Sequence, residues 1–308
     1  MKILVYGTGG VGGYYGISLE EAGHDVTFLA RGKHLETMQK DGLKLKSIDG
    51  DYTIDKPIVT DNVDSLSSDF DLILLGVKSW QVTEAVKVIK PILNDKTVIL
   101  PLQNGVNNIE DLLEIIDSKH VLAGFCKIYA KIEGYGVINH FGHPPELQFG
   151  ELDNTLSERV KWMKSEFEKA RFKTTVPKDI IANIWKKFMF ICTVSGLGAL
   201  TRVSIGRMYE HEATRKLLQV EVQEIYDIAL AKGVNFPEDM VEQTMKFISK
   251  QPYESTASTQ RDIMAGRPSE LDNFNGYIVR AGKQLGIATP THEFVYSCLL
   301  PLEQIARN

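Results

Sequence analysis

Apolar residues in the first half of the chain form short runs that alternate with helical patterns. Lys2–Tyr6 is typical of a β-strand, and a second apolar run, Val26–Leu29, follows an amphipathic stretch that ends at Gly23. Leu72–Val77 is apolar without interruption, as is typical of a parallel strand buried on both faces. This alternation of strands and helices predicts a doubly wound parallel sheet.

The same order continues through this half. The residues after Arg31 predict a helix to residue 40 and then a hairpin beside the sheet, over residues 43–59. The other predicted elements are strands at 97–102, 121–126, 136–141, 146–149 and 173–176, and helices at about 80–90 and 155–170. Together they predict a Rossmann-type sheet with antiparallel additions.

Only helical patterns follow Pro177. They cover roughly 179–200, 208–232, 238–265, 270–285 and 291–306. We therefore expect an α/β protein, with an N-terminal Rossmann-type, doubly wound parallel sheet in residues 1–177 and an all-α C-terminal domain in residues 178–308. Active sites commonly lie in the cleft between two such domains, outside the carboxyl ends of the strands.

A glycine pattern directly follows the first predicted strand. Although a lone G-x-G-x-x-G is often only a loop, here it lies between a strand and a helix, with a second strand after them. Gly7 permits the tight turn, Gly9 lets the backbone approach a pyrophosphate, and Gly12 lets the helix pack close to the strand. The predicted cofactor-binding residues of this loop are Gly7, Thr8, Gly9, Gly10, Val11 and Gly12.

The end of the second predicted strand indicates which dinucleotide is bound. Arg31, Lys33 and His34 are basic, and no Asp or Glu lies between Val26 and Leu35. A carboxylate there would repel a 2′-phosphate, whereas a guanidinium can donate two hydrogen bonds to it. These residues predict NADPH as the cofactor; the alternative is that Arg31 is a solvated loop arginine.

Composition narrows the class of protein. The chain has 308 residues, of which 43% are hydrophobic, and a net charge of −5 with interspersed signs, which argues against nucleic acid as the main partner. No apolar run approaches the roughly twenty residues that cross a bilayer. The chain begins directly with a strand, so we expect no signal or transit peptide. Three widely spaced cysteines suggest reduced thiols and a cytoplasmic protein.

A second informative stretch is Ile180–Ala199, whose core is apolar all round and predicts a buried helix. Helical spacing from Lys187 places four residues on one face: Ile191, Val194, Ser195 and Gly198. A lysine over a face with a small hydroxyl and a glycine can point into a cavity and serve as a proton donor. The alternative is a lysine pair, Lys186 and Lys187, that extends from a helix end into solvent.

Several short motifs occur in order along the chain. They are the glycine loop, Lys78-Ser79-Trp80-Gln81, Asn104-Gly105, Trp185-Lys186-Lys187, the separate residues Ser258, Asp262 and Glu270, and Asn275-Gly276-Tyr277. Together they resemble the ketopantoate reductase (2-dehydropantoate 2-reductase) family over essentially the whole chain. The resemblance implies NADPH-dependent reduction of 2-dehydropantoate to pantoate, a step of pantothenate and coenzyme A biosynthesis.

The resemblance also implies roles for single residues. Lys187 matches the general acid of the family, and Glu270 matches the glutamate that orients this lysine and the substrate hydroxyl. By position alone, Glu270 is equally a carboxylate at a helix N-terminus. Ser258 and Asp262 share a helix face. Ser258 matches a substrate-binding serine, while Asp262 is either a support or a surface charge.

Three further residues match cofactor contacts of the family. Asn104 matches an asparagine that contacts cofactor or substrate. Lys78 matches a lysine near the nicotinamide. Arg31 matches the arginine that meets the 2′-phosphate, in agreement with the argument from charge. The resemblance also implies a possible homodimer through the helical domain.

The chain departs from the family after Lys187. Two asparagines of the well-known members are replaced here by Ile191 and Ser195. Ile191 cannot form a hydrogen bond, and Ser195 stays a candidate substrate contact of shorter reach. A different 2-oxo acid or an imine is therefore an alternative substrate. A protein that only senses NADPH is a third reading, against which the retained Lys187 and Glu270 argue.

No metal site is expected. His140 and His143 are three residues apart, but a turn follows and no third ligand is visible. The predicted partner is a small-molecule 2-oxo acid, with no nucleic acid and no membrane.

Overall fold

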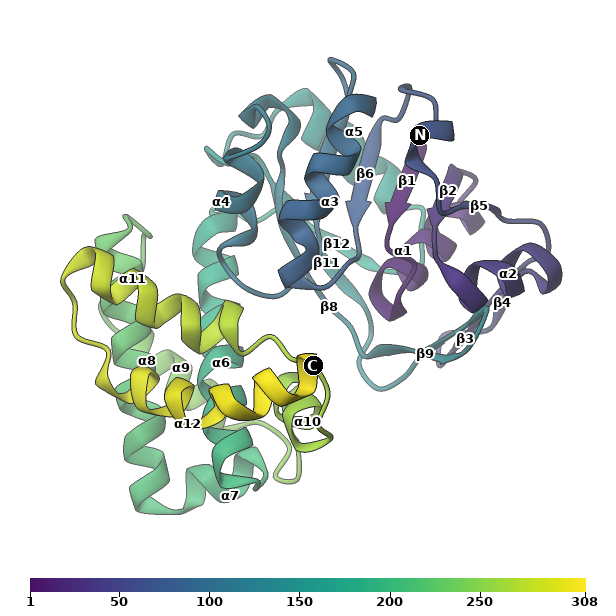
Figure 1. Ribbon diagram of the computed structural model, residues 1–308. Helices are drawn as coiled ribbons and strands as arrows, with labels where there is room; N and C mark the ends of the chain where they lie inside the picture. Colours follow the sequence, from purple (N-terminus) through teal and green to yellow (C-terminus); the bar gives the residue numbers. More distant parts are fainter. The chain divides into compact units, whose positions relative to one another are not determined.

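The computed structural model describes all 308 residues, which divide into two compact units (Figure 1). One unit comprises Met1–Asn104 and Asn108–Ile180, and the other comprises Gly105–Asn107 and Ile181–Asn308. The division thus falls after Ile180, where the sequence had suggested a boundary after residue 177. The short piece Gly105–Asn107, in the middle of the first half, was not expected in the helical unit.

The core of the first unit is a parallel sheet of five strands in the order β5-β2-β1-β6-β7. The strands are β1 (Lys2–Tyr6), β2 (Asp25–Leu29), β5 (Ile58–Thr60), β6 (Leu72–Leu75) and β7 (Val98–Pro101). Along β1, Ile3 and Val5 enter one hydrophobic cluster, while Leu4 and Tyr6 enter another on the opposite face. Burial on both faces explains the uninterrupted apolar runs, and the strand order confirms the predicted Rossmann-type fold.

Helices cover both faces of this sheet. Helices α3 (Val82–Ile89) and α4 (Asn108–Leu113) contribute to the cluster around Leu4. Helices α1 (Gly10–Glu21), α2 (Gly32–Asp41) and α5 (Glu158–Phe167) contribute to the cluster around Ile3. The unit is therefore doubly wound, as the sequence predicts.

Two smaller mixed sheets complete the unit. One has the order β4-β3-β10-β9 and the other β12-β11-β8. Their strands are β3 (Leu43–Ser47), β4 (Tyr52–Ile54), β8 (Ala123–Lys127), β9 (Ala130–Gly134), β10 (Val137–His140), β11 (Glu146–Gly150) and β12 (Lys173–Thr175). The predicted hairpin exists as β3–β4, but it belongs to the separate four-stranded sheet, and the return run also supplies β5 to the central sheet. Strand β9 was not predicted, because it is largely exposed and lacks an apolar alternation.

Glycines allow α1 to lie between the central sheet and the four-stranded sheet. A Cβ atom at Gly16 would lie 2.5 Å from the Phe28 ring. On the other side, a Cβ atom at Gly10 would lie 2.6 Å from the Ala130 carbonyl oxygen in β9. Both distances are too short for a real side chain, so the position of α1 requires glycine on both faces.

The second unit is helical. Its elements are α6 (Ile180–Thr201), α7 (Ile205–Glu210), α8 (Glu212–Ala231), α9 (Met240–Ser249), α10 (Ser258–Met264), a π-helical turn η5 (Asp272–Gly276), α11 (Tyr277–Leu285) and α12 (Pro290–Arg307). Two predicted helices are each divided into two. The first divides at His211, which has an extended backbone, and the second divides in the segment that contains Pro252, which lacks an N–H donor.

Helix α6 is more apolar than the sequence reading allowed. It has 22 residues and a window with a mean hydropathy of 1.3, so by length and composition alone it is long and apolar enough to cross a membrane. The expectation that no such run exists was wrong, because Lys186 and Lys187 interrupt the apolar run without lowering its average enough. Of this window, 61% is buried within the protein, as in the core helix of a soluble domain, which passes the same test.

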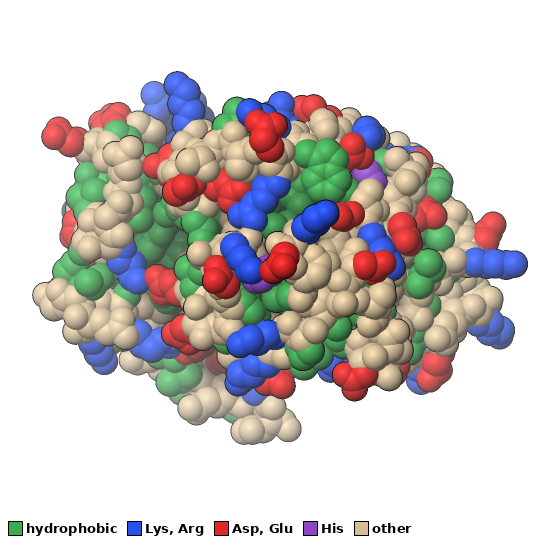
Figure 2. All heavy atoms as spheres, turned by 90° about the horizontal axis from the view of Figure 1, so that it is seen from above, with side chains coloured by type: hydrophobic (Ala, Val, Ile, Leu, Met, Phe, Trp, Pro, Cys, Tyr) green, Lys and Arg blue, Asp and Glu red, His purple; other side chains and the backbone are tan.

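Charged side chains of both signs are interspersed on the surface. On the face seen in Figure 2, Lys and Arg side chains lie among Asp and Glu side chains, without a patch of a single sign. This distribution matches the small net charge of −5.

A buried carboxylate holds α12 against α8. Glu224 of α8 accepts hydrogen bonds from the backbone N–H groups of Thr291 and His292 and bonds to Nδ1 of His292 at 2.6 Å. Burial alone would raise the pKa of Glu224, but the His292 ring and these N–H groups hold that pKa below its usual value. Glu221, one turn earlier, is 0% exposed and neither of its carboxyl oxygens has a hydrogen-bond partner. Burial raises the pKa of Glu221 well above its ordinary value, and the nearby Glu224 adds to this effect.

Gly10→Ala is expected to destabilise the first unit by about 1–3 kcal/mol, because the new methyl group meets the backbone of β9 rather than a side chain that can move. Gly134→Ala is the matched control, since no atom lies within 4 Å of the position of its Cβ. Urea unfolding curves of both variants measure the difference. Equal stability of the two variants would contradict the packing of α1 described above.

Glu221→Gln is expected to stabilise the protein at pH 8 and to have little effect near pH 4. In the unfolded chain this carboxyl ionises near pH 4.5, but in the fold it keeps its proton to higher pH. The folded state therefore binds more protons, and stability falls as pH rises above about 4.5. Removing the ionisable group should recover roughly 1–3 kcal/mol at pH 8.

Thermal unfolding at both pH values tests this, with Glu224→Gln as the control. That variant should be destabilised at pH 8, because it loses a charged partner of α12. A Glu221→Gln variant that is less stable than the parent at pH 8 would show that the buried acid has a stabilising partner.

Candidate functional site

The glycine loop between β1 and α1 has a conformation that requires glycine. Gly7 has a φ of +103°, and a Cβ atom there would lie 2.8 Å from the backbone nitrogen of Val77. The next residue, Thr8, donates two hydrogen bonds to the Leu29 carbonyl oxygen, from its backbone N–H at 3.1 Å and from its hydroxyl at 3.0 Å. The loop is thereby attached to the carboxyl end of β2.

The first turn of α1 fits the phosphates of a dinucleotide. Gly9 is the N-cap and no side chain caps the turn, which also contains no acidic residue. The nearest atom to a Cβ at Gly9 would be the Gly76 carbonyl oxygen, at 3.9 Å, so there is space directly beside this backbone. N–H groups at an uncapped helix N-terminus bind anions such as a pyrophosphate.

Arg31 lies where the sequence reading places it, at the carboxyl end of β2. It is the exposed N-cap of α2, whose first turn contains no acidic residue. Burial raises the pKa of the Tyr6 phenol, and the adjacent Arg31 guanidinium opposes this rise. This places the guanidinium next to the end of β1 as well.

His34 does not contribute positive charge to this cluster. The backbone N–H of Gly136 donates to Nδ1 of His34 at 3.0 Å, and burial lowers the pKa of the imidazole. A neutral ring with Nδ1 as the acceptor carries its proton on Nε2. His34 is therefore a structural link between α2 and the β9–β10 turn, and the basic cluster reduces to Arg31 and Lys33.

The ends of β6 and β7 carry the other two predicted residues of this unit. Lys78 follows β6, with its Nζ 5.8 Å from the centre of the Trp80 ring, and Asn104 follows β7. Gln103, which the sequence reading missed, joins the two strand ends: its Nε2 donates to the carbonyl oxygens of Leu75 at 2.8 Å and Val77 at 3.0 Å. The glycine loop, Arg31, Lys78 and Asn104 thus all lie at the carboxyl edge of one sheet, which is where such folds bind their ligands.

In the helical unit, Lys187 lies on α6 beside a group of packed aromatic rings. The centres of the Trp185 and Phe188 rings are 5.8 Å apart, and Phe188 also packs against Phe274 and Tyr277. These contacts fix α6 against the segment that follows Glu270. Lys187 is half-buried, whereas Lys186 is exposed.

Glu270 is buried in the segment between α10 and η5, where its carbonyl oxygen accepts from the Phe274 N–H at 2.9 Å. The preceding residue is held by α12. Glu303 accepts from the Ser269 backbone N–H at 3.0 Å and from its hydroxyl, and Arg307 donates to the Ser269 carbonyl oxygen at 3.0 Å. No local pattern predicts this support, since Glu303 lies in α12, 34 residues after Ser269.

The remaining candidates differ in their exposure. Ser258 is the exposed first residue of α10. Asp262, one turn later, accepts hydrogen bonds from the Arg267 guanidinium at 2.7 and 3.0 Å and so forms a surface ion pair near the end of α10. Ser195 is only 1% exposed. Its proposed contact with a substrate therefore stays a prediction with little accessible hydroxyl to support it.

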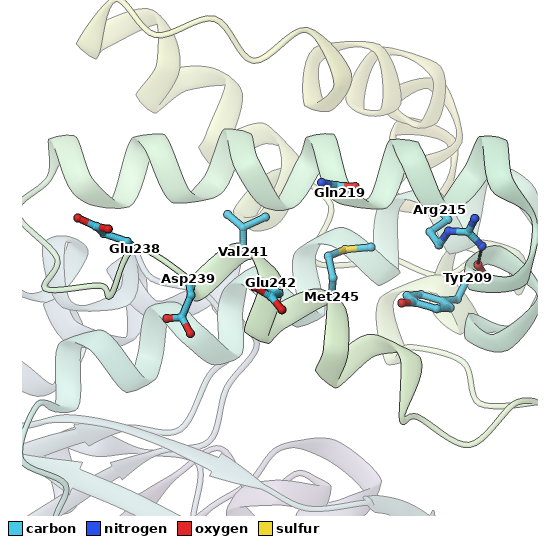
Figure 3. Close-up of a pocket in the computed structure, with 8 residues that line it drawn as sticks. All are labelled: Tyr209, Arg215, Gln219, Glu238, Asp239, Val241, Glu242 and Met245. Atoms are coloured by element: carbon cyan, nitrogen blue, oxygen red, sulfur yellow. Dashed lines mark hydrogen bonds between the residues drawn. The ribbon is translucent and has the colours of Figure 1, made fainter.

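A separate open pocket of 760 Å³ lies on the helical unit (Figure 3). Its lining residues come from α7, α8, the turn before α9 and α9 itself: Tyr209, Arg215, Gln219, Glu238, Asp239, Val241, Glu242 and Met245. None of the predicted site residues lines it. Three carboxylates against one arginine make it unfavourable for an anionic 2-oxo acid.

No group of three or more His, Cys, Asp or Glu side chains is arranged to hold a metal ion. The His140 ring is engaged on both sides, with Nδ1 2.8 Å from the Ser47 hydroxyl and Nε2 3.1 Å from the His143 carbonyl oxygen.

Comparison with known proteins shows the family. Residues 3–154 match the family described as ketopantoate reductase PanE/ApbA, and residues 179–303 match its C-terminal domain. The chain belongs to the ketopantoate reductase family.

Two relatives are similar to this chain over nearly its whole length. The uncharacterized oxidoreductase YkpB of Bacillus subtilis is 30% identical over 299 residues, 97% of this chain and 98% of the relative. A 2-dehydropantoate 2-reductase of Nostoc sp. is 26% identical over 300 residues, 96% of this chain and 93% of the relative. Both alignments extend over the two units. They support the conclusion that this chain is an oxidoreductase.

Two solved structures are also similar. The PanE/ApbA family ketopantoate reductase of Ralstonia eutropha JMP134 has a TM-score of 0.89 at 28% identity, with 100% of both chains covered. A D-mandelate dehydrogenase, solved with NADH and anilino(oxo)acetate, has a TM-score of 0.88 at 20% identity, again with 100% of both chains covered. The second likeness shows the shared fold alone.

Proposed function

We propose that this protein is an NADPH-dependent oxidoreductase that reduces the carbonyl group of a 2-oxo acid, with 2-dehydropantoate as the first candidate substrate. Reduction of that compound would yield pantoate, within pantothenate and coenzyme A biosynthesis. The observation that carries the proposal is that a half-buried lysine, Lys187, and a buried glutamate, Glu270, both lie in the helical unit of a chain of the ketopantoate reductase family. A cytoplasmic location and a homodimer stay predictions.

The first unit supplies the groups that would hold the cofactor. The N–H groups at the start of α1 suit a pyrophosphate, and Arg31 suits a 2′-phosphate, because its guanidinium meets no carboxylate in the first turn of α2. Lys78 and Asn104 lie at the same sheet edge, where the nicotinamide end would bind. When bound there, the reduced dinucleotide supplies a hydride to the carbonyl carbon.

The helical unit supplies the proton. As negative charge develops on the carbonyl oxygen, the Lys187 ammonium stabilises it and donates a proton from Nζ. Glu270 would orient that ammonium. The hydrogen bonds that Ser269 donates to Glu303 and accepts from Arg307 restrict the backbone next to Glu270, which favours a fixed orientation.

Another 2-oxo acid or an imine is the second candidate substrate, and Ile191 is the observation that favours it. This side chain lies one turn after Lys187 and cannot form a hydrogen bond with a polar substrate group. A protein that binds NADPH without turnover has less support, because a sensor needs neither Lys187 nor Glu270.

The direct test is NADPH oxidation, followed by absorbance, with 2-dehydropantoate as substrate and NADH as the control cofactor. NADPH-dependent turnover would support the proposal. Tight NADPH binding without turnover on any 2-oxo acid would instead support the sensing role.

Lys187→Ala is expected to lower kcat about 10²–10⁴-fold, because it removes the proton donor, while NADPH affinity changes little. Lys186→Ala is the matched control, since it removes an exposed lysine from the adjacent position of the same helix. Steady-state kinetics and fluorescence titration with NADPH measure the two effects. Equal losses of turnover and of NADPH affinity in Lys187→Ala would refute the assigned role.

Arg31→Glu is expected to weaken NADPH binding at least about tenfold relative to NADH, because a carboxylate repels the 2′-phosphate and a charge-assisted contact is lost. Lys33→Glu makes the same charge change two residues away and should alter the preference less. Dissociation constants for both cofactors test this. An unchanged preference in Arg31→Glu would show that the arginine does not contact the phosphate.

A further inference from the structure

The accessible side of α6 has an apolar residue directly after the predicted proton donor. Asn183, Lys187 and Ile191 follow one another at a spacing of four, and all three are half-buried. This spacing places them on one face of the helix. A group that binds beside Lys187 and extends toward the carboxyl end of α6 therefore meets Ile191.

Beyond Ile191, α6 offers no accessible polar side chain for a whole turn and more. The residues from 192 to 199 are all buried, and the Ser195 hydroxyl, which lies on the same face, belongs to a residue that is 1% exposed. The next residue, Gly196, has no space for a side chain, because a Cβ atom there would lie 2.7 Å from Oδ1 of Asn275. Ile191 is thus the last accessible side chain on this face of α6.

The residues on either side of Ile191 are packed within the helical unit. The preceding residue, Phe190, packs edge to face against Phe247, with 4.9 Å between the ring centres. The following residue, Cys192, is completely buried, and burial raises the pKa of its thiol well above the ordinary value. Neither neighbour can present a polar group in place of Ile191.

We propose that Ile191 selects the side chain of the substrate, so that the protein prefers 2-oxo acids whose chain is purely alkyl or aryl at this position over those with a hydroxyl there. This inference rests on the proposed function, since it takes Lys187 as the proton donor to the substrate carbonyl. A hydroxyl buried against isoleucine loses its hydrogen bonds to water without replacement, whereas a methyl group gains apolar contact.

A matched pair of substrates tests the proposal. 2-Dehydropantoate is 4-hydroxy-3,3-dimethyl-2-oxobutanoate, and 3,3-dimethyl-2-oxobutanoate differs from it only by lacking the hydroxyl. With NADPH, kcat/KM is expected to be about ten- to a hundredfold higher for the compound without the hydroxyl, the range that an apolar pocket achieves against an added hydroxyl.

Variants at the same position link this ratio to Ile191. Ile191→Asn introduces an amide that can bond to the hydroxyl, and it should bring the ratio of the two kcat/KM values to one or reverse it. Ile191→Leu stays apolar and should keep the ratio of the parent. Ile191→Thr, which retains β-branching and adds a hydroxyl, serves in place of Ile191→Asn if that variant does not fold.

Calorimetric titration of both acids in the presence of NADP⁺ gives a second readout, since no hydride is available and nothing is turned over. Tighter binding of 3,3-dimethyl-2-oxobutanoate by the parent, reduced in Ile191→Asn, supports the proposal even if neither acid oxidises NADPH. That combination would mean that the proposed reduction is wrong and the selectivity is right.

Three results would overturn the selectivity. The parent could prefer 2-dehydropantoate in turnover or binding, Ile191→Asn could leave the ratio unchanged, or neither acid could bind. The last result would also remove 2-dehydropantoate as the first candidate substrate.

Discussion

The close approach of α1 to the sheets on both sides is the constraint on which the nucleotide-binding unit depends. Gly7, Gly12 and Gly76 meet where α1 crosses the central sheet, and a Cβ at Gly12 would lie 2.2 Å from the Gly7 carbonyl oxygen. On the opposite side, Gly10 and Gly13 admit β9 and β10. A helix whose first turn consists mainly of glycine leaves its N–H groups accessible, so the packing that fixes α1 also exposes the N–H groups that we propose to bind the pyrophosphate.

Local sequence sufficed to predict much of this unit. The strand Lys2–Tyr6 was predicted with the bounds that the structure has, because a parallel strand buried on both faces is apolar throughout. The places of the glycine pattern, between a strand and a helix, and of Arg31, after the next strand, could be predicted because they depend on neighbours within about thirty residues. His34 was misjudged as part of a basic cluster, since its neutral state depends on a hydrogen bond from Gly136, 102 residues away.

Features set by distant contacts could not be predicted. Strand β9 has no apolar alternation and exists because it pairs with β10. Gly105–Asn107 joins the helical unit although it lies within the sequence of the other. The support of the segment around Glu270 by Glu303 of α12 likewise connects residues that no local pattern relates. The candidate site residues could therefore be recognised in the sequence from their residue types. The distant residues that hold them in place could not.

Different forces would govern the two ligand preferences that we propose for this protein. The preference for NADPH over NADH would follow from charge, because the exposed Arg31 would attract the 2′-phosphate. A single substitution of Arg31 by an acidic residue reverses the charge at this position. The preference for a substrate would follow from packing, since α6 is buried from residue 192 onward and Lys187 lies just before this buried part. Polar groups in the buried part must be paired or inaccessible, as Ser195 is, so a substrate beside Lys187 would meet an apolar surface. The burial that stabilises α6 would thus limit the polarity of the molecules that it can recognise.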